Sequence, residues 1–175
     1  LLLLTTTLPL TALFSQYLYS ASTIDVWSQT TAAPEDIASN YVTTYNNRIY
    51  SISGATSSVF SSGFYSSPIN ADGIISSWNA LSSKPKPRYW HSGARHGRFL
   101  YLLGGIENSN NSSSVQLGKI DPNTGDITNW EDQFNLPKSL SFGSSIVVGN
   151  NLYYAGGNTV PSENVSASTN QNIYM

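Results

Sequence analysis

The side chains best suited to chemistry gather in one stretch of the 175-residue sequence, between Lys84 and Arg98. This stretch holds five of the eight lysines and arginines, both histidines and two neighbouring aromatic residues. Arginine supplies planar donors and tryptophan a stacking face, a combination that suits an anionic ligand or a glycan. The candidate ligand-binding residues are Arg88, Trp90, His91, Arg95 and His96. The alternative is a solvated connecting loop in which Arg88 and His91 serve packing.

Metal binding and catalysis find little support in the sequence. His91 and His96 lie five residues apart on a predicted strand, so they would point to opposite faces. The run from Asp121 to Asp126 resembles a calcium loop only faintly, because it lacks the bidentate glutamate, and a hairpin turn explains it. Serines are too numerous for any selection of a Ser–His–acid triad. No catalytic residue, metal ligand or cofactor is therefore assigned.

Composition restricts the partners and the location of the protein. Charged residues make up 10% of the chain and the net charge is −2, so the composition lacks the excess of basic residues that is typical of nucleic-acid-binding proteins. Residues 1–22 join an uncharged apolar run to small residues and are typical of a truncated signal peptide, without the initiator Met and basic region. The run is short for a membrane span, and Pro9 interrupts it. We therefore expect an extracellular or cell-surface protein.

Two kinds of landmark recur with one period along the chain. The last glycines of three apolar runs lie 51 and 52 residues apart, and so do three tryptophans. Such self-similarity is the signature of solenoids and propellers. The repeat positions are Gly54, Gly104, Gly105, Gly156 and Gly157 for the glycines, and Trp27, Trp78 and Trp130 for the tryptophans. We expect the glycines to allow close backbone approach and the tryptophans to pack between repeats.

Turn signals divide each repeat into four antiparallel strands. The expected strands are 24–27; 40–45, 48–53, 64–70 and 74–78; 92–96, 99–103, 115–120 and 126–130; and 144–148, 152–155 and one beginning near Asn172. A small four-stranded sheet buries little by itself, whereas radial stacking covers both of its faces. The sequence thus predicts an all-β fold made of four-stranded antiparallel β-propeller blades. Their expected boundaries are an outer strand at 24–27, blades at 37–78 and 88–130, and an incomplete blade at 139–175.

The repeat resembles the kelch repeat. An apolar strand ends in Gly104–Gly105, and a further strand, the turn Asp121-Pro122-Asn123-Thr124-Gly125 and Trp130 follow it. Arg88-Tyr89-Trp90-His91 is similar to the Arg-x-x-His motif that precedes the innermost strand in that family. The first repeat has Ser53–Gly54 in place of the glycine pair, so the likeness is to a divergent member. The resemblance implies the kelch, galactose-oxidase-like β-propeller fold of six or seven blades, of which about three are present.

The resemblance and the Lys84–Arg98 stretch together favour a binding or adhesion module with a protein or glycan ligand at the propeller mouth. The alternative is a sugar-modifying enzyme similar to the sialic-acid mutarotases, which would use Arg88, His91 and Arg95. That enzyme would need a buried carboxylate facing these arginines. The acids considered all fall in predicted loops, namely Glu35, Asp36, Glu107, Glu131 and Glu163. The Cys–Tyr copper chemistry of galactose oxidase is not encoded, because the chain has no cysteine.

Three blades are fewer than the four to eight that propellers use. We expect the chain to be a fragment of a longer propeller. The alternative is that two chains pool three blades each. Unpaired strands at the open blade edges would then serve as templates for self-association.

Overall fold

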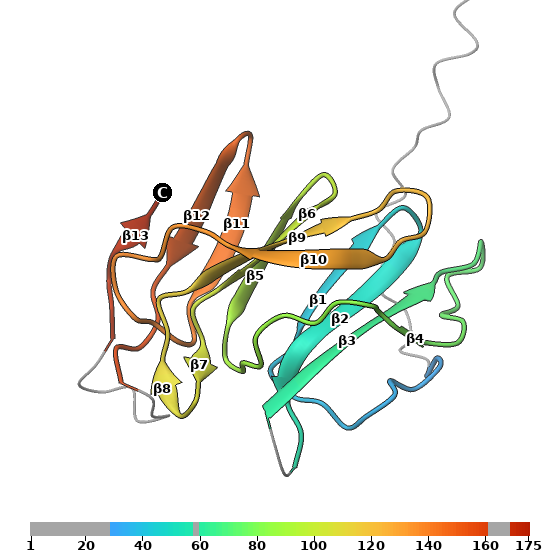
Figure 1. Cartoon of the computed structure of the whole chain (residues 1–175), viewed down its shortest axis with the longest axis horizontal. Helices are drawn as coiled ribbons and strands as arrows, with labels where there is room; N and C mark the ends of the chain where they lie inside the picture. The colour runs from blue at the N-terminus through green and yellow to red at the C-terminus, as the bar shows by residue number, and fades with distance from the viewer. Residues whose placement is uncertain (1–28, 58–59, 161–168) are drawn as a thin grey trace, which may run out of the picture.

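The computed structural model describes residues 29–57, 60–160 and 169–175, which form three antiparallel sheets and one short hairpin (Figure 1). Blade 1 has the order β1 (Tyr41–Tyr45), β2 (Arg48–Ala55), β3 (Phe60–Pro68) and β4 (Asn79–Ala80). Blade 2 has the order β5 (Ser92–His96), β6 (Phe99–Leu103), β9 (Val115–Ile120) and β10 (Ile127–Asp132). Blade 3 consists of β11 (Ser144–Val148), β12 (Asn151–Ala155) and β13 (Ile173–Tyr174). The hairpin joins β7 (Ile106–Glu107) to β8 (Asn110–Asn111).

The three blades pack with corresponding strands next to one another. The innermost strands β1, β5 and β11 are neighbours across the blades. The Ser92 hydroxyl of blade 2 lies 2.7 Å from the Ser145 hydroxyl of blade 3. The all-β fold of antiparallel propeller blades is therefore confirmed. The predicted leader 1–22 and the outer strand 24–27 lie outside the described residues.

The hydrophobic core lies between the blades rather than within any one of them. Between blades 1 and 2 it contains Tyr50 and Phe64 from one side and Leu100 and Leu102 from the other. Trp130 joins this core, with its ring centroid 5.5 Å from that of Phe64 in an edge-on arrangement. A single blade would leave these apolar faces in water, so the blades stabilise one another. Within the described ranges there is no apolar helix of membrane-spanning length.

At both ends of the blades, several residues adopt positive φ, and most of them are asparagine or glycine. Asn46 and Asn47 have φ of 49° and 55°, which gives the tight hairpin that the sequence predicts between β1 and β2. At the opposite end, Gly105 has φ of 89°, and a β carbon there would lie 2.7 Å from the His91 Cβ. Ser53 takes the first glycine position in blade 1 at φ of 54°, and its hydroxyl donates to the Arg88 carbonyl at 2.8 Å. We call these two ends the hairpin end and the Gly–Gly end.

The predicted strands agree with the structure except at three places. The strand predicted at 74–78 is wrong, because the Asn70 carboxamide oxygen accepts the N–H groups of Asp72 and Ile74 and holds a wide turn. Ile75 makes only an isolated antiparallel bridge to Ile69, and a strand forms only at β4. Strand β3 begins at Phe60, four residues earlier than predicted. The β7–β8 hairpin was not predicted, and Glu107, expected in a loop, lies in β7.

Candidate functional site

The five predicted ligand-binding residues separate into three places around β5. Trp90 lies two residues before β5, at the Gly–Gly end. Arg95 and His96 close β5 at the hairpin end, beside the turn at Gly97. Arg88 and His91 have their polar atoms in the interior. The sequence stretch thus does not form one continuous patch.

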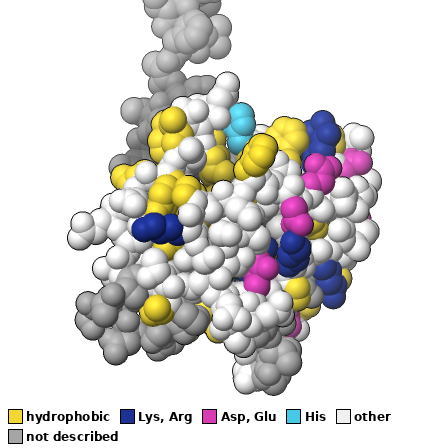
Figure 2. All heavy atoms as spheres, turned by 60° about the vertical axis from the view of Figure 1, so that its left-hand side comes forward, with side chains coloured by type: hydrophobic (Ala, Val, Ile, Leu, Met, Phe, Trp, Pro, Cys, Tyr) yellow, Lys and Arg dark blue, Asp and Glu magenta, His cyan; other side chains and the backbone are white. Residues whose placement is uncertain are grey.

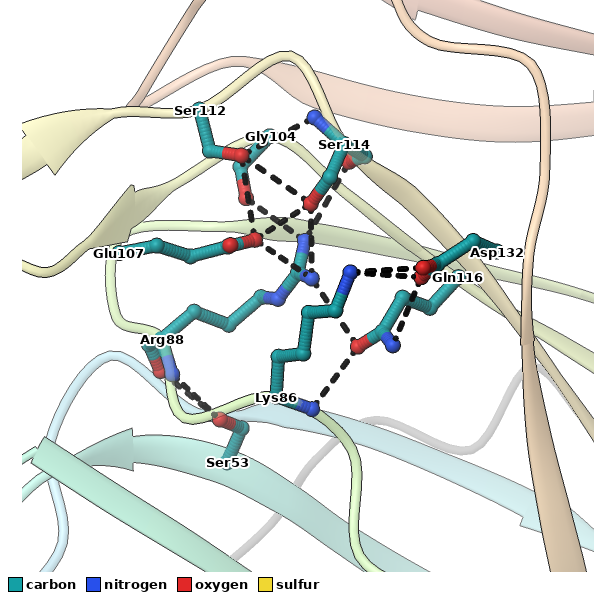
Figure 3. A network of polar contacts seen from close by, with 9 residues as sticks. All are labelled: Ser53, Lys86, Arg88, Gly104, Glu107, Ser112, Ser114, Gln116 and Asp132. Atoms are coloured by element: carbon teal, nitrogen blue, oxygen red, sulfur yellow. Dashed lines mark hydrogen bonds and ion pairs between the residues drawn. The ribbon is translucent and has the colours of Figure 1, made fainter.

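Arg88 is fully buried and joins blade 1 to blade 2 (Figure 3). Its backbone belongs to blade 1, because its carbonyl accepts the Gly54 N–H at 2.8 Å and its N–H donates to the Ser53 hydroxyl at 3.1 Å. Its guanidinium belongs to blade 2, where Nη2 lies 2.6 Å from a carboxylate oxygen of Glu107. Nη1 donates to the Gly104 carbonyl at 3.0 Å. Burial lowers the Arg88 pKa, and the Glu107 charge opposes that shift.

A polar network leads from this guanidinium to the surface (Figure 3). Gln116 Oε1 accepts from Arg88 Nη2 at 3.0 Å and from the Lys86 N–H at 2.9 Å. The Gln116 amide donates to Asp132 at 3.2 Å. Lys86 Nζ completes the network with an exposed ion pair to Asp132 at 2.8 Å. The Lys86 ammonium is the main cause of the lowered pKa of Asp132.

Most polar atoms of the Arg88–Glu107 pair have partners within the protein, although Arg88 Nε is buried without an acceptor among the described residues. Besides the guanidinium, the same oxygen of Glu107 accepts the hydroxyls of Ser112 and Ser114. A carboxylate that faces an arginine, as the enzyme alternative requires, is therefore present. The geometry nevertheless favours the packing role for Arg88, because its nitrogen donors are directed at blade 2 rather than at solvent.

His91 has both ring nitrogens buried against the Gly–Gly end of blade 2. Burial, together with the smaller effect of the Arg88 charge, lowers its pKa to about 3, and the Ile52 backbone opposes part of this shift. The imidazole is therefore neutral in the folded protein at physiological pH. This placement also favours the packing alternative over direct contact with an exposed ligand.

An aromatic stack stands at the Gly–Gly end, where the chain enters the innermost strands. The Trp90 ring centroid lies 4.7 Å from that of Tyr89 and 4.0 Å from that of Phe142, which belongs to blade 3. The Phe142 N–H donates to the Trp90 carbonyl at 2.9 Å. Trp90 and Phe142 have positive φ, 51° and 59°, as Ser39 does one repeat earlier at 58°. Sequence reasoning missed Phe142, although its spacing of 52 residues from Trp90 follows the repeat.

The remaining sequence candidates lie apart from the Arg88 network and from the aromatic stack. Asp121 Oδ1 accepts the N–H groups of Asn123 and Thr124, as the hairpin-turn interpretation predicts. In the part of the chain that is described, no group of three or more His, Cys, Asp or Glu side chains could hold a metal ion. The Arg95 guanidinium lies over the Tyr45 ring, 5.7 Å from its centroid. His96 is exposed.

Comparison with known proteins supports the fold. No protein-family model matches the sequence. Over 78 residues the chain is 30% identical to the Leucine-zipper-like transcriptional regulator 1 homolog of Drosophila melanogaster. The matched segment covers 45% of this chain and 8% of that protein. The solved structure of YjhT superposes with a TM-score of 0.63 at 16% identity, over 84% of this chain and 45% of that one. The chain forms kelch-like β-propeller blades. It spans less than half of either of these proteins.

Replacing Arg88 should destabilise the kelch-like array far more than replacing Lys86. Arg88→Met leaves Glu107 partly buried without its cation, which we expect to cost about 3–5 kcal/mol of unfolding free energy. Lys86→Met breaks an exposed pair and should cost about 0–1 kcal/mol. Urea unfolding followed by tryptophan fluorescence measures both. Equal losses would contradict the role of Arg88 as the link between blades.

His91 should make stability depend on pH. Its folded-state pKa lies below the ordinary value of 6.5, so the unfolded chain binds the proton first as the pH falls. The contribution of His91 to the unfolding free energy is therefore fully present above pH 6.5 and decreases towards pH 3. Between pH 7 and pH 5 this decrease is about 2 kcal/mol. His91→Asn, which places there the residue that Asn40 provides in blade 1, should remove this loss in urea titrations. The matched variant His96→Asn should retain it, and the opposite pattern would refute the assignment.

Proposed function

We propose that the protein is a secreted or cell-surface binding module of the kelch-like β-propeller type, whose protein or glycan ligand docks at the Gly–Gly end. The observation that carries this proposal is the contact between Trp90 and Phe142. These rings come from neighbouring blades, and Phe142 is 40% exposed although it is a large apolar side chain. Exposed aromatic rings on a rigid scaffold are typical anchors of binding surfaces. The low content of charged residues, 10%, and the predicted leader support an extracellular location.

The backbone holds this aromatic pair in place before any ligand arrives. Trp90 and Phe142 adopt a left-handed conformation that bulky residues rarely take, and one main-chain hydrogen bond links them. Strain of this kind persists only where the surrounding structure imposes it, and it gathers at ligand-binding sites. The β7–β8 hairpin lies at the same end (Figure 1). There the Asn111 carboxamide oxygen is buried and lacks a donor among the described residues.

The enzyme alternative has weaker support. Its one favourable feature is the carboxylate of Glu107 opposite Arg88. Both groups are committed to each other and to surrounding hydroxyls, so neither is poised to exchange a proton with a substrate. Binding by the exposed rings needs no such rearrangement. We therefore place the sugar-modifying function second.

Removing either ring should weaken ligand binding without unfolding the protein. Trp90→Ser and Phe142→Ser introduce the residue that Ser39 provides at this position in blade 1. Ligands are first selected with the wild-type protein on a glycan array and a peptide-display library, and affinities are then measured by calorimetry. We expect roughly tenfold weaker binding for each variant, the size of a lost aromatic contact.

Phe134→Ser is the matched control, because Phe134 is 98% exposed outside the stack. It should bind as the wild type does. Undiminished binding by both stack variants, or a loss with Phe134→Ser alone, would overturn the site. A wild-type protein with no glycan or peptide hits would overturn the proposed function itself.

A second candidate function is assembly with a second copy through the open blade faces. Ile146 and Val148 of β11 are 61% and 57% exposed, and Ile173 of β13 is 70% exposed. On β5, the equivalent strand of blade 2, alternate side chains are buried instead: Ser92 and Ala94 are buried, and Ser92 contacts blade 3. Figure 2, which brings blade 3 forward, shows hydrophobic side chains in groups on this side. Blade 3 thus presents a face of the kind that the neighbouring blades bury.

The opposite end of the array also points to a further blade. The connection that leaves blade 1 crosses β10 of blade 2, where the Ser83 N–H donates to the Ile127 carbonyl at 3.1 Å. One repeat earlier, Thr31 donates its hydroxyl to the Ile75 carbonyl at 2.6 Å, and the Thr30 hydroxyl accepts the Ile75 N–H at 3.2 Å. Thr30 and Thr31 therefore contact blade 1 in the same way that the connection around Ser83 contacts blade 2. This is the position that a connection from a preceding blade would take. A second copy could supply that blade.

Light scattering tests this assembly. We expect twice the chain mass for the wild type and a single chain mass for Ile146→Asp, because a charge buried in the interface is costly. Phe134→Asp is the matched control and should leave the double mass unchanged. A single mass for the wild type across the micromolar range would exclude assembly with a second copy.

A further inference from the structure

A polar cleft of about 620 Å³ opens at the hairpin end, between blades 1 and 2. The turn between β1 and β2, the wide turn before β4 and the end of β5 form its walls. Its polar lining consists of Thr44, Tyr45, Asn46, Asn47, Asn70 and Arg95. It lies at the opposite end of β5 from Trp90, so it is separate from the aromatic stack.

The only charged side chain in this lining is that of Arg95. Its Nη1 donates to the Gly97 carbonyl at 2.6 Å, and its Nε is buried without an acceptor. The ion pairs found in the described ranges are Lys86–Asp132 and Arg88–Glu107. The Arg95 charge therefore faces no carboxylate of the described chain at ion-pair distance. A guanidinium with unused donors is suited to an oxyanion.

The asparagines supply neutral hydrogen-bonding groups at fixed positions. Asn46 and Asn47 are held by the left-handed conformation of their turn. Asn70 uses its carboxamide oxygen for the N–H groups of Asp72 and Ile74, and these bonds do not involve its amide nitrogen. Carboxamides donate and accept at once, as the hydroxyl groups of a polyol do. The cleft thus combines one positive charge with several amide groups and the Tyr45 ring.

We propose that this cleft is a second ligand site, for a small polyhydroxylated carboxylate such as a hexuronate. The carboxylate binds the Arg95 guanidinium, and the sugar hydroxyls bind the amides of Asn47 and Asn70. The cleft volume accommodates a monosaccharide. We expect the cleft to prefer a ligand with one negative charge, because Arg95 is the one charged residue of the lining. A single counter-charge stabilises such a cation in a partly desolvated cleft.

The test compares galacturonate with galactose, which differ at the carboxylate. Saturation-transfer NMR and calorimetry with the full chain should show galacturonate binding at least tenfold tighter than galactose. Arg95→Gln should remove this difference, whereas Arg98→Gln, an arginine outside the cleft, should preserve it. Asn47→Gly, which keeps the positive φ of the turn, should weaken both sugars. Thermal melts confirm that each variant is folded.

Several outcomes would overturn the second site. These are no binding of galacturonate, equal binding of galactose, or an Arg95→Gln variant that binds galacturonate as the wild type does. Trp90→Ser separates the two sites, because it should leave galacturonate binding unchanged. A loss of galacturonate binding in Trp90→Ser would transfer that ligand to the aromatic stack and refute the cleft.

Discussion

The packing of blade 1 on blade 2 depends on one buried cation. Arg88 is 0% exposed, and its charge is stabilised only because Glu107, Ser114 and Gln116 come together around it. Burying a guanidinium is costly, and only good geometry with several acceptors repays that cost. The backbone of Arg88 is bonded to Ser53 and Gly54 of blade 1. Any displacement of one blade against the other would therefore leave a charge unpaired.

This link also determines what the Gly–Gly end can present. Because the backbone of Arg88 is anchored, the chain must turn sharply before it enters β5, and Trp90 takes the left-handed conformation in that turn. The glycine pair leaves room for this approach, since a β carbon on Gly105 would collide with His91 and Tyr89. Packing and the display of aromatic rings are thus consequences of the same close contact. The rings are thus positioned by the packed core beneath them.

The two ends of β5 are chemically different although the strand between them is short. The Gly–Gly end carries stacked rings, whereas the hairpin end carries Arg95, asparagines and the Tyr45 ring. A blade contributes a turn at one end and a connection at the other, so each end collects its own kind of side chain. Ligand recognition in such folds is located in these connections, while the strands only position them.

The sequence by itself determined the repeat, the all-β class and most strand bounds, because apolar alternation and turn residues act locally along the chain. The strand predicted at 74–78 failed because the side chain of Asn70 reorganises the turn. Arg88 and Arg95 belong to one sequence stretch, yet only tertiary structure decided that the first is buried and the second lines a cleft. Burial depends on partners from distant segments, such as Glu107 in the unpredicted β7. Such pairings follow from the stacking of blades, and no local pattern of residues contains them.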